Sequence, residues 1–231
     1  MAALKRLPVA VEQRPLMNFA PPQDWAPLDD ALACLNQYGA VAVTSPRAAQ
    51  AVAERLRARS AAVSAGSLPV AWASGPATAV GLDGLLGSVR LPATRGGRLG
   101  AAHALARAML AEHVAGPVLF PCGEAHREEL PAVLRSAGLS VDEIVCYRSV
   151  LADVADARVA AQLGTILIVA SPMVASLLAQ ACPRGHRPGL LAVGPTTAES
   201  ARAAGWPPAA VAVEPSVRGL AAAVKGLLEN R

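Results

Sequence analysis

The chain has 231 residues, of which 53% are hydrophobic and only 3% aromatic, and its formal net charge is +4. So few aromatic side chains argue against nucleic-acid recognition by base stacking, and the small positive charge suggests an anionic partner only weakly. The length suffices for one large domain or two small ones.

Apolar runs separated by turn residues predict strands and helices that alternate along the chain. In chain order we expect a strand at 9–11, extended chain at 16–19, a helix at 25–35, a strand at 41–44, a helix at 48–59, a strand at 70–73, a helix at 78–86, a strand at 89–91, a helix at 99–113, a strand at 118–121, a helix at 127–137 and a strand at 141–147. We then expect strands at 166–170, 190–193 and 211–213, with helices at 174–180, 197–204 and 219–228. Because these strands are apolar throughout, the pattern is typical of buried parallel sheets in an α/β protein.

The segment from Gly164 to Cys182 carries no charged residue and resembles a membrane span in length. Ser171 and Pro172 interrupt it, so we expect a strand, a turn and a helix instead. The four cysteines are far apart and no secretion signal precedes them, which predicts reduced thiols in a cytoplasmic protein. We therefore expect neither a membrane segment nor a disulfide framework.

The sequence contains one long internal repeat. Each copy has an apolar run ending in Ser-Pro, an alanine-rich stretch, and a second apolar run ending in Gly-Pro-x-Thr-Ala. The matched pairs are Ser45-Pro46 with Ser171-Pro172, and Gly75-Pro76 with Gly194-Pro195. A period this long indicates two related halves and not a solenoid.

The repeated pairs fall where strands lead into helices, and such turns expose backbone amides at the carboxyl edge of a sheet. Helix N-termini attract anions, so these turns could bind carboxylates. The candidate side chains are Thr44, Ser45, Arg47, Thr78, Ser171, Thr196 and Thr197. Alternatively, Ser-Pro and Gly-Pro only begin helices well, and the residues alone leave both interpretations open.

Several catalytic patterns are missing from the sequence. It has no phosphate-binding P-loop, no dinucleotide fingerprint and no nucleophile elbow, and its four histidines are dispersed, so we predict no metal site. In the charged run 124–129, Glu128 and Glu129 are expected to form a solvated first helical turn. Tyr147 ends a strand and is either a hydrogen-bond donor or a packing residue.

Six segments, in this order, resemble the uroporphyrinogen-III synthase family. They are Val-Thr-Ser-Pro-Arg-Ala at 43–48, Gly-Pro-Ala-Thr-Ala at 75–79, Val-Leu-Phe-Pro-Cys-Gly-Glu-Ala-His-Arg-Glu-Glu-Leu-Pro at 118–131, Val-Cys-Tyr-Arg at 145–148, Ala-Ser-Pro at 170–172 and Val-Gly-Pro-Thr-Thr-Ala at 193–198. Each segment is unspecific alone, but the ordered set is specific.

The resemblance implies an α/β fold of two domains with parallel sheets, flavodoxin-like lobes joined by a two-stranded linker that the chain crosses twice. Residues 1–19 and 152–231 would form the first domain and 23–146 the second, with linkers at 16–22 and 147–152. The family's usual first strand, ending in Thr-Arg-Pro, would precede Met1, so we expect the first domain to lack that strand. The repeated turns would face one cleft between the lobes.

The activity implied by the resemblance is a cofactor-free lyase reaction that closes hydroxymethylbilane to uroporphyrinogen III through a spirocyclic intermediate, inverting the last pyrrole ring. The residues carried over are Tyr147 as the catalytic hydrogen-bond donor or acid, and Ser45, Arg47, Gly75, Thr78, Gly123, Ser171, Gly194, Thr196 and Thr197 for substrate binding. The protein would be a cytoplasmic monomer in tetrapyrrole biosynthesis that contacts hydroxymethylbilane synthase transiently, and would bind neither nucleic acid nor membrane. The alternative is a non-catalytic two-lobed protein that binds tetrapyrroles or anions.

Overall fold

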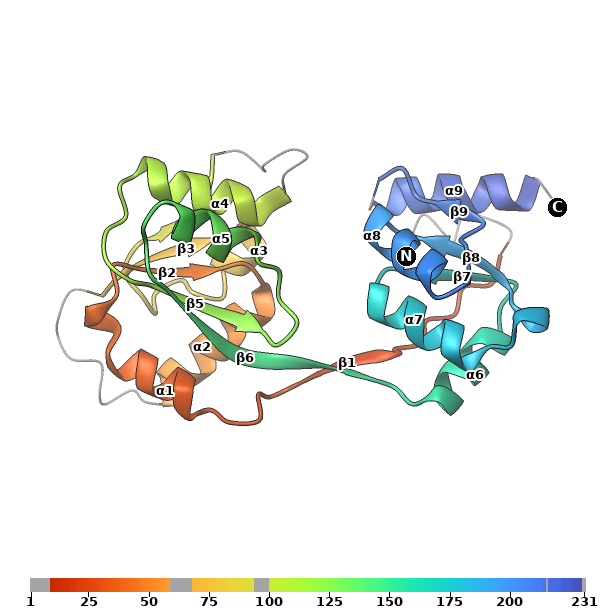
Figure 1. The fold of residues 1–231 in the computed structure, drawn as a ribbon, viewed down its shortest axis with the longest axis horizontal. Coiled ribbons are helices and arrows are strands. Elements are labelled where there is room, and N and C mark those ends of the chain that lie inside the picture. The colour runs from red at the N-terminus through yellow and green to blue at the C-terminus, as the bar shows by residue number, and fades with distance from the viewer. Residues whose placement is uncertain (1–8, 59–67, 94–99, 215, 230–231) are drawn as a thin grey trace. The chain divides into compact units, whose positions relative to one another are not determined.

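The computed structural model describes residues 9–58, 68–93, 100–214 and 216–229 (Figure 1). The chain divides into two compact units. The central unit is Phe19–Ser149, and the terminal unit combines Met1–Asn18 with Val150–Arg231. The chain therefore passes twice from one unit to the other.

The central unit is built on a six-stranded sheet in the order β1-β6-β5-β2-β3-β4. Its strands are β1 (Met17–Ala20), β2 (Ala40–Val43), β3 (Val70–Ala73), β4 (Val89–Arg90), β5 (Val118–Gly123) and β6 (Val141–Leu151). Its helices are α1 (Ala26–Ala33), η2 (Leu35–Gln37), α2 (Pro46–Ala58), α3 (Pro76–Ala79), α4 (Gly100–Ala111) and α5 (Glu129–Ser136). The pairs β2–β3, β2–β5, β3–β4 and β5–β6 are all parallel, as the apolar strands predicted.

Helices cover both faces of this sheet, which explains why its strands are apolar throughout (Figure 1). Val41 and Val43 of β2 lie in a buried cluster with residues of α1 and α2. Ala40 and Ala42, which alternate with them, lie in a second cluster with residues of α4 and α5. Successive side chains of a strand point to opposite faces, so a strand covered on both sides is apolar at every position.

The strand order locates a topological switch point. Without the two-residue β4, the order β3-β2-β5-β6 is the 2-1-3-4 order of flavodoxin-like sheets, and β4 extends it beyond β3. The order reverses between β2 and β5, whose carboxyl ends are followed by Thr44 and by the turn at Gly123. In open α/β sheets, ligands bind beyond the carboxyl ends of the strands at such a point.

The terminal unit contains a three-stranded parallel sheet in the order β7-β8-β9. Its elements are α6 (Val154–Gln162), β7 (Ile166–Val169), α7 (Pro172–Ala181), η4 (Arg184–His186), β8 (Gly189–Ala192), α8 (Pro195–Ala203), β9 (Ala210–Val211) and α9 (Val217–Glu229). The uncharged segment 164–182 is divided between β7 and α7. No helix among the described residues is long and apolar enough to span a membrane.

The fold class expected from the sequence, α/β with parallel sheets, is confirmed. Two local predictions are wrong, and one helix was missed. Residues 9–11 form no strand. The helix expected at 78–86 is the one-turn α3 followed by turns, in which Gly84 adopts a left-handed φ of 71°. Helix α6 was not predicted. The expected lack of an opening strand concerns the start of the chain, where residues 1–8 lie outside the described residues.

Candidate functional site

A cavity of about 330 Å³ lies in the central unit beside the switch point. Its lining includes Thr44 and Ser45 after β2, Ser74 after β3, Gly123 at the end of β5, and Tyr147 on β6. Residues 100–102 at the start of α4 and residues of the turn that follows β5 complete the wall. Four of the site residues singled out from the sequence therefore line one cavity: Thr44, Ser45, Gly123 and Tyr147.

Hydroxyl groups define one side of this cavity. The Ser45 Oγ accepts a hydrogen bond from the Ala48 amide at 3.1 Å, so it caps α2. The Ser74 Oγ donates to the Thr44 carbonyl at 3.0 Å and ties the two turns together. Because a hydroxyl can donate and accept at once, the capping role of Ser45 leaves its own proton available to a ligand.

The phenol of Tyr147 forms another side of the cavity, directly over Gly123. A β-bulge between Cys122 and Gly123 shifts the β5–β6 register, so that Gly123 pairs with Tyr147. A Cβ built on Gly123 would lie 2.6 Å from the Tyr147 Cζ and 2.8 Å from its Oη. Glycine is therefore required at position 123 to admit the phenol, a close approach that the sequence did not show.

Phe19 connects Tyr147 with Arg47. The rings of Phe19 and Tyr147 meet edge to face with centroids 5.8 Å apart. The Arg47 guanidinium carbon stands 3.5 Å from the centre of the Phe19 ring, in a cation–π contact. Phe19 remains 38% exposed, so this row of side chains holds a cation at the surface of the central unit.

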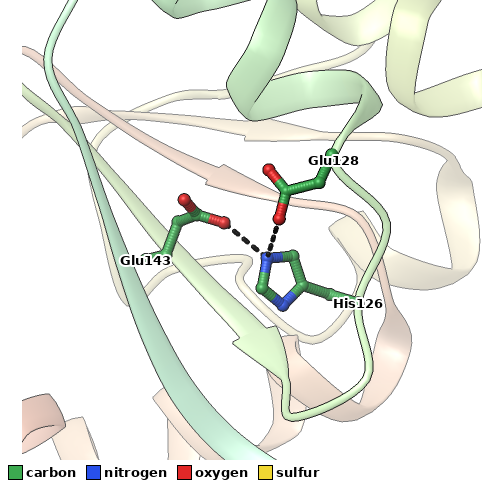
Figure 2. Close-up of side chains that lie close together, drawn as sticks. All are labelled: His126, Glu128 and Glu143. Carbon is green, nitrogen blue, oxygen red and sulfur yellow. Dashed lines mark hydrogen bonds and ion pairs between the residues drawn. The ribbon is translucent and has the colours of Figure 1, made fainter.

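The turn after β5 carries a polar network (Figure 2). The His126 Nδ1 lies 3.0 Å from the Gly123 carbonyl oxygen, and its Nε2 is in hydrogen-bond contact with Glu143 on β6. The Arg135 Nη2 pairs with the other oxygen of Glu143 at 2.5 Å. Burial raises the pKa of Glu143, but the hydrogen bonds from Arg135 and His126 outweigh it and lower the pKa below its usual value. The solvated role expected for this run is therefore wrong for His126, which is bonded on both ring nitrogens.

The glycines of the two Gly-Pro turns are not required by local sterics. Gly75 and Gly194 precede α3 and α8 with extended φ values of −176° and −163°. A Cβ built on either would meet no atom within 4 Å among the described residues. Glycine thus leaves open space beside the first helical amides, as a turn that admits a ligand close to the backbone would.

Burial divides the side chains of these turns into two groups. Arg47 and Thr196, at the second positions of α2 and α8, are exposed. Thr78 and Thr197, at the third positions of α3 and α8, are only 3% and 4% exposed. A ligand can reach the first pair directly, whereas the second pair lies under the turn.

The terminal unit repeats the arrangement of turns at the carboxyl ends of its own strands. Ser171 follows β7 and precedes α7, and Gly194 follows β8. The Ser171 Oγ lies 3.9 Å from the Met17 sulfur. Ser171, Gly194, Thr196 and Thr197 therefore share one edge of the β7–β8 sheet, because parallel strands end at the same edge.

The two buried thiols of the central unit, Cys122 and Cys146, are unsuited to nucleophilic chemistry. Burial raises the pKa of Cys122 to about 12, with a further contribution from Glu143. Burial likewise raises the pKa of Cys146 to about 12, with a contribution from Cys122. The thiolate is the reactive form, so both groups are inert near neutral pH.

Sequence inspection did not single out Phe19, Glu143 or the ring contacts of His126. Glu143 stands opposite Phe120 in the β5–β6 register, which brings it near the turn that carries His126. That register depends on the packing of the whole sheet. The only local sequence signal for this network was the charged run at 124–129. It did not indicate that Glu143 would be the partner of His126.

The family model, a relative by sequence and the solved structures that resemble this chain all carry the name of the same enzyme. Residues 1–222 match the family model described as "Uroporphyrinogen-III synthase HemD". A uroporphyrinogen-III synthase from Synechococcus elongatus is 29% identical in an alignment 155 residues long, which covers 64% of this chain and 54% of that protein. The chain thus spans about half the length of this curated relative.

Two solved structures share the fold. The uroporphyrinogen-III synthetase of Helicobacter pylori superposes with a TM-score of 0.62 at 18% identity, covering 94% of this chain and 91% of that one. A mutant uroporphyrinogen III synthase of Thermus thermophilus gives a TM-score of 0.57 at 18% identity, covering 100% and 94%. At this identity the likeness establishes a common two-domain α/β architecture.

Proposed function

The chain belongs to the uroporphyrinogen-III synthase family, and we propose that it catalyses the reaction for which the family is named. It would close the linear tetrapyrrole hydroxymethylbilane to uroporphyrinogen III and invert the last pyrrole ring. The observation that carries this proposal is the cavity of the central unit. Ser45, Gly123 and Tyr147, three residues that the family resemblance assigns to the site, line it together at the switch point.

Substrate binding is assigned to the turns at the carboxyl edges of the two sheets. The substrate carries eight carboxylates, and helix N-termini, hydroxyls and an arginine fork all suit carboxylates. Arg47 and Thr196 are exposed and would bind carboxylates directly, together with the hydroxyls of Ser45 and Ser171. Gly75 and Gly194 would let carboxylates approach the backbone, and Gly123 would admit the Tyr147 phenol.

Thr78 and Thr197, which are buried residues, have a different part in this scheme. Their side chains lie beneath the first helical turns of α3 and α8. We assign them to holding these turns in the shape that binds a carboxylate. Their contribution to binding would therefore pass through the backbone that they support.

We assign Tyr147 to the first chemical step. Its phenol lines the cavity and would donate a hydrogen bond to the hydroxyl that leaves the substrate as water. The resulting azafulvene is attacked by the substituted carbon of the last ring, and the spirocyclic product fragments and recloses as the inverted ring. The remaining task of the protein is to hold the chain in a folded conformation, since ring closure without inversion proceeds in water unaided.

We also propose, from family membership, the enzyme class, the cellular location, the oligomeric state and the source of the substrate. The protein would be a lyase that uses no cofactor, acts as a cytoplasmic monomer, and receives its substrate from hydroxymethylbilane synthase. Because hydroxymethylbilane cyclises spontaneously, an assay should generate it with hydroxymethylbilane synthase in the same reaction mixture.

The experiment that tests the proposed function supplies hydroxymethylbilane in situ and separates the type I and type III products after oxidation. A reaction without the chain gives the baseline of type I product. Type III product that increases with the amount of chain supports the synthase. Type I alone, formed at the uncatalysed rate while the substrate binds to the chain, would identify the non-catalytic binding protein instead.

A further inference from the structure

In the central unit, three side chains each direct one ligand atom toward a common point: His126, Glu128 and Glu143 (Figure 2). These three atoms all lie within 4.8 Å of one another. None of the three residues has a role in the reaction proposed above. We propose that they form a binding site for a divalent transition-metal ion, with Zn²⁺ as the best fit.

The imidazole of His126 is oriented as a metal ligand. Its Nδ1 donates to the Gly123 carbonyl at 3.0 Å, which directs Nε2 toward the two carboxylates. Metal-binding histidines usually donate the second ring N–H to a carbonyl or carboxylate in this way, because the bond fixes the tautomer and the ring orientation. Without an ion, Nε2 is in hydrogen-bond contact with Glu143.

The carboxylate of Glu143 is held from outside the cluster. Arg135 binds one of its oxygens at 2.5 Å, and the same guanidinium nitrogen donates to the Val141 carbonyl at 2.9 Å. The second oxygen of Glu143 is thereby turned toward His126. This arrangement leaves one oxygen for an ion and keeps the carboxylate in place by a bond that the ion does not disturb.

The distances between the three ligand atoms require only a small adjustment to match those around a zinc ion. Zn–N and Zn–O bonds of about 2.0–2.1 Å place tetrahedral ligands about 3.3 Å apart. The Glu128 oxygen lies 3.7 Å from the His126 Nε2, which is already close to this value. Glu143 lies nearer, so its free oxygen and the His126 ring have to move apart, while the contact with Arg135 is kept. Glu128 is 71% exposed and can move freely to complete the set.

The donor types select the metal. One imidazole nitrogen and two carboxylate oxygens suit Zn²⁺, which accepts three protein ligands and keeps a fourth position for water or an anion. Ca²⁺ requires six to eight oxygen ligands, more than this cluster supplies. The two carboxylates balance the charge of a divalent ion. Because His126 also lines the cavity, the ion would add positive charge to its wall, beside the groups that bind anions.

The test is calorimetric titration of the full chain, freed of metal by a chelator, with Zn²⁺ alone. We expect one ion per chain, and Glu128→Gln and His126→Ala to weaken its affinity by about 10- to 100-fold or more. The matched controls are Glu129→Gln, the adjacent carboxylate, and His103→Ala on α4, and both should bind as the wild type does. Ca²⁺ should give no comparable binding.

Two results would overturn the site. One is an unchanged Zn²⁺ affinity in both Glu128→Gln and His126→Ala. The other is binding that disappears in Cys34→Ser, which would assign the ion to the exposed thiol. Glu128 is exposed, so Glu128→Gln keeps the test valid even if His126→Ala fails to fold. The titration needs no substrate, so its outcome is independent of whether the chain makes type III product.

Discussion

The phenol of Tyr147 occupies the space in which any side chain at position 123 would begin, since a Cβ on Gly123 would stand 2.8 Å from the Tyr147 Oη. Gly123→Ala therefore has to displace the phenol or the strand end that carries it. We expect a loss of about 1–3 kcal/mol in the free energy of unfolding, typical of overpacking. We also expect a fall in kcat for type III formation, because the ring leaves its position in the cavity. Denaturant unfolding and isomer analysis of one preparation measure both, and wild-type values in each would show that the contact is dispensable.

Tyr147→Phe keeps the ring and removes only its hydroxyl. If that group assists departure of the substrate hydroxyl, kcat should fall by about tenfold or more, the equivalent of one hydrogen bond of roughly 1.4 kcal/mol. KM and the unfolding midpoint should change little. Tyr38→Phe is the control, because the Tyr38 hydroxyl donates to Asp142 at 2.9 Å and Tyr38 is not part of the cavity lining. Equal kcat values for the two variants would make Tyr147 a packing residue.

Gly75→Ala and Gly194→Ala test whether the Gly-Pro turns admit carboxylates. Each new methyl group enters open space at an extended φ, so we expect the free energy of unfolding to stay constant or rise by up to about 1 kcal/mol. KM should nevertheless increase, because the methyl group covers the amides that would bind the substrate. Gly226→Ala on α9, which also enters open space, is the matched control and should leave KM unaltered. An unchanged KM in both turn variants would leave these turns with a purely structural role.

The buried thiols make a prediction about pH. The pKa of Cys122 and of Cys146 is raised by burial to about 12 in the folded state, above that of an exposed thiol. A raised folded pKa stabilises the protein below the unfolded pKa, and this contribution is lost as pH increases from about 9 toward 12. The free energy of unfolding should fall across that range. At pH 8 a thiol reagent should label Cys34 quickly and the buried cysteines only after denaturation. Rapid labelling of four thiols in the native protein would contradict this account.

Much of the fold follows from local sequence signals, and its failures have physical causes. The apolar runs of β2, β3 and β8 are short and bounded by Ser-Pro or Gly-Pro, so both their type and their ends were predictable. Helix α6 escaped prediction because its buried positions are only Ala157 and Ala161, which give a faint apolar stripe. The sequence signal for this helix was Asp153, a residue type typical of an N-cap, which accepts a hydrogen bond from the Asp156 amide.

The candidate site was predictable only where its residues follow directly from the turns. Ser45 follows β2, and parallel strands bring such ends to one edge. The expectation that Tyr147 ends a strand is wrong, because β6 continues to Leu151, and Tyr147 reaches the site by pairing with the last residue of β5. The approach of Tyr147 to Gly123 depends on a β-bulge, and the contact of His126 with Glu143 depends on the register of β5 and β6. Both are set by tertiary packing, which local patterns do not encode. The burial of Thr78 and Thr197 likewise depends on how α3 and α8 pack.

The measurement that tests the central claim most directly is the fraction of type III product as a function of chain concentration, with hydroxymethylbilane formed at a constant rate. The account predicts that this fraction increases from the uncatalysed baseline to near unity as the chain is added. It also predicts that Tyr147→Phe shifts the curve to higher chain concentration. A product that remains type I at every concentration would contradict the proposed function.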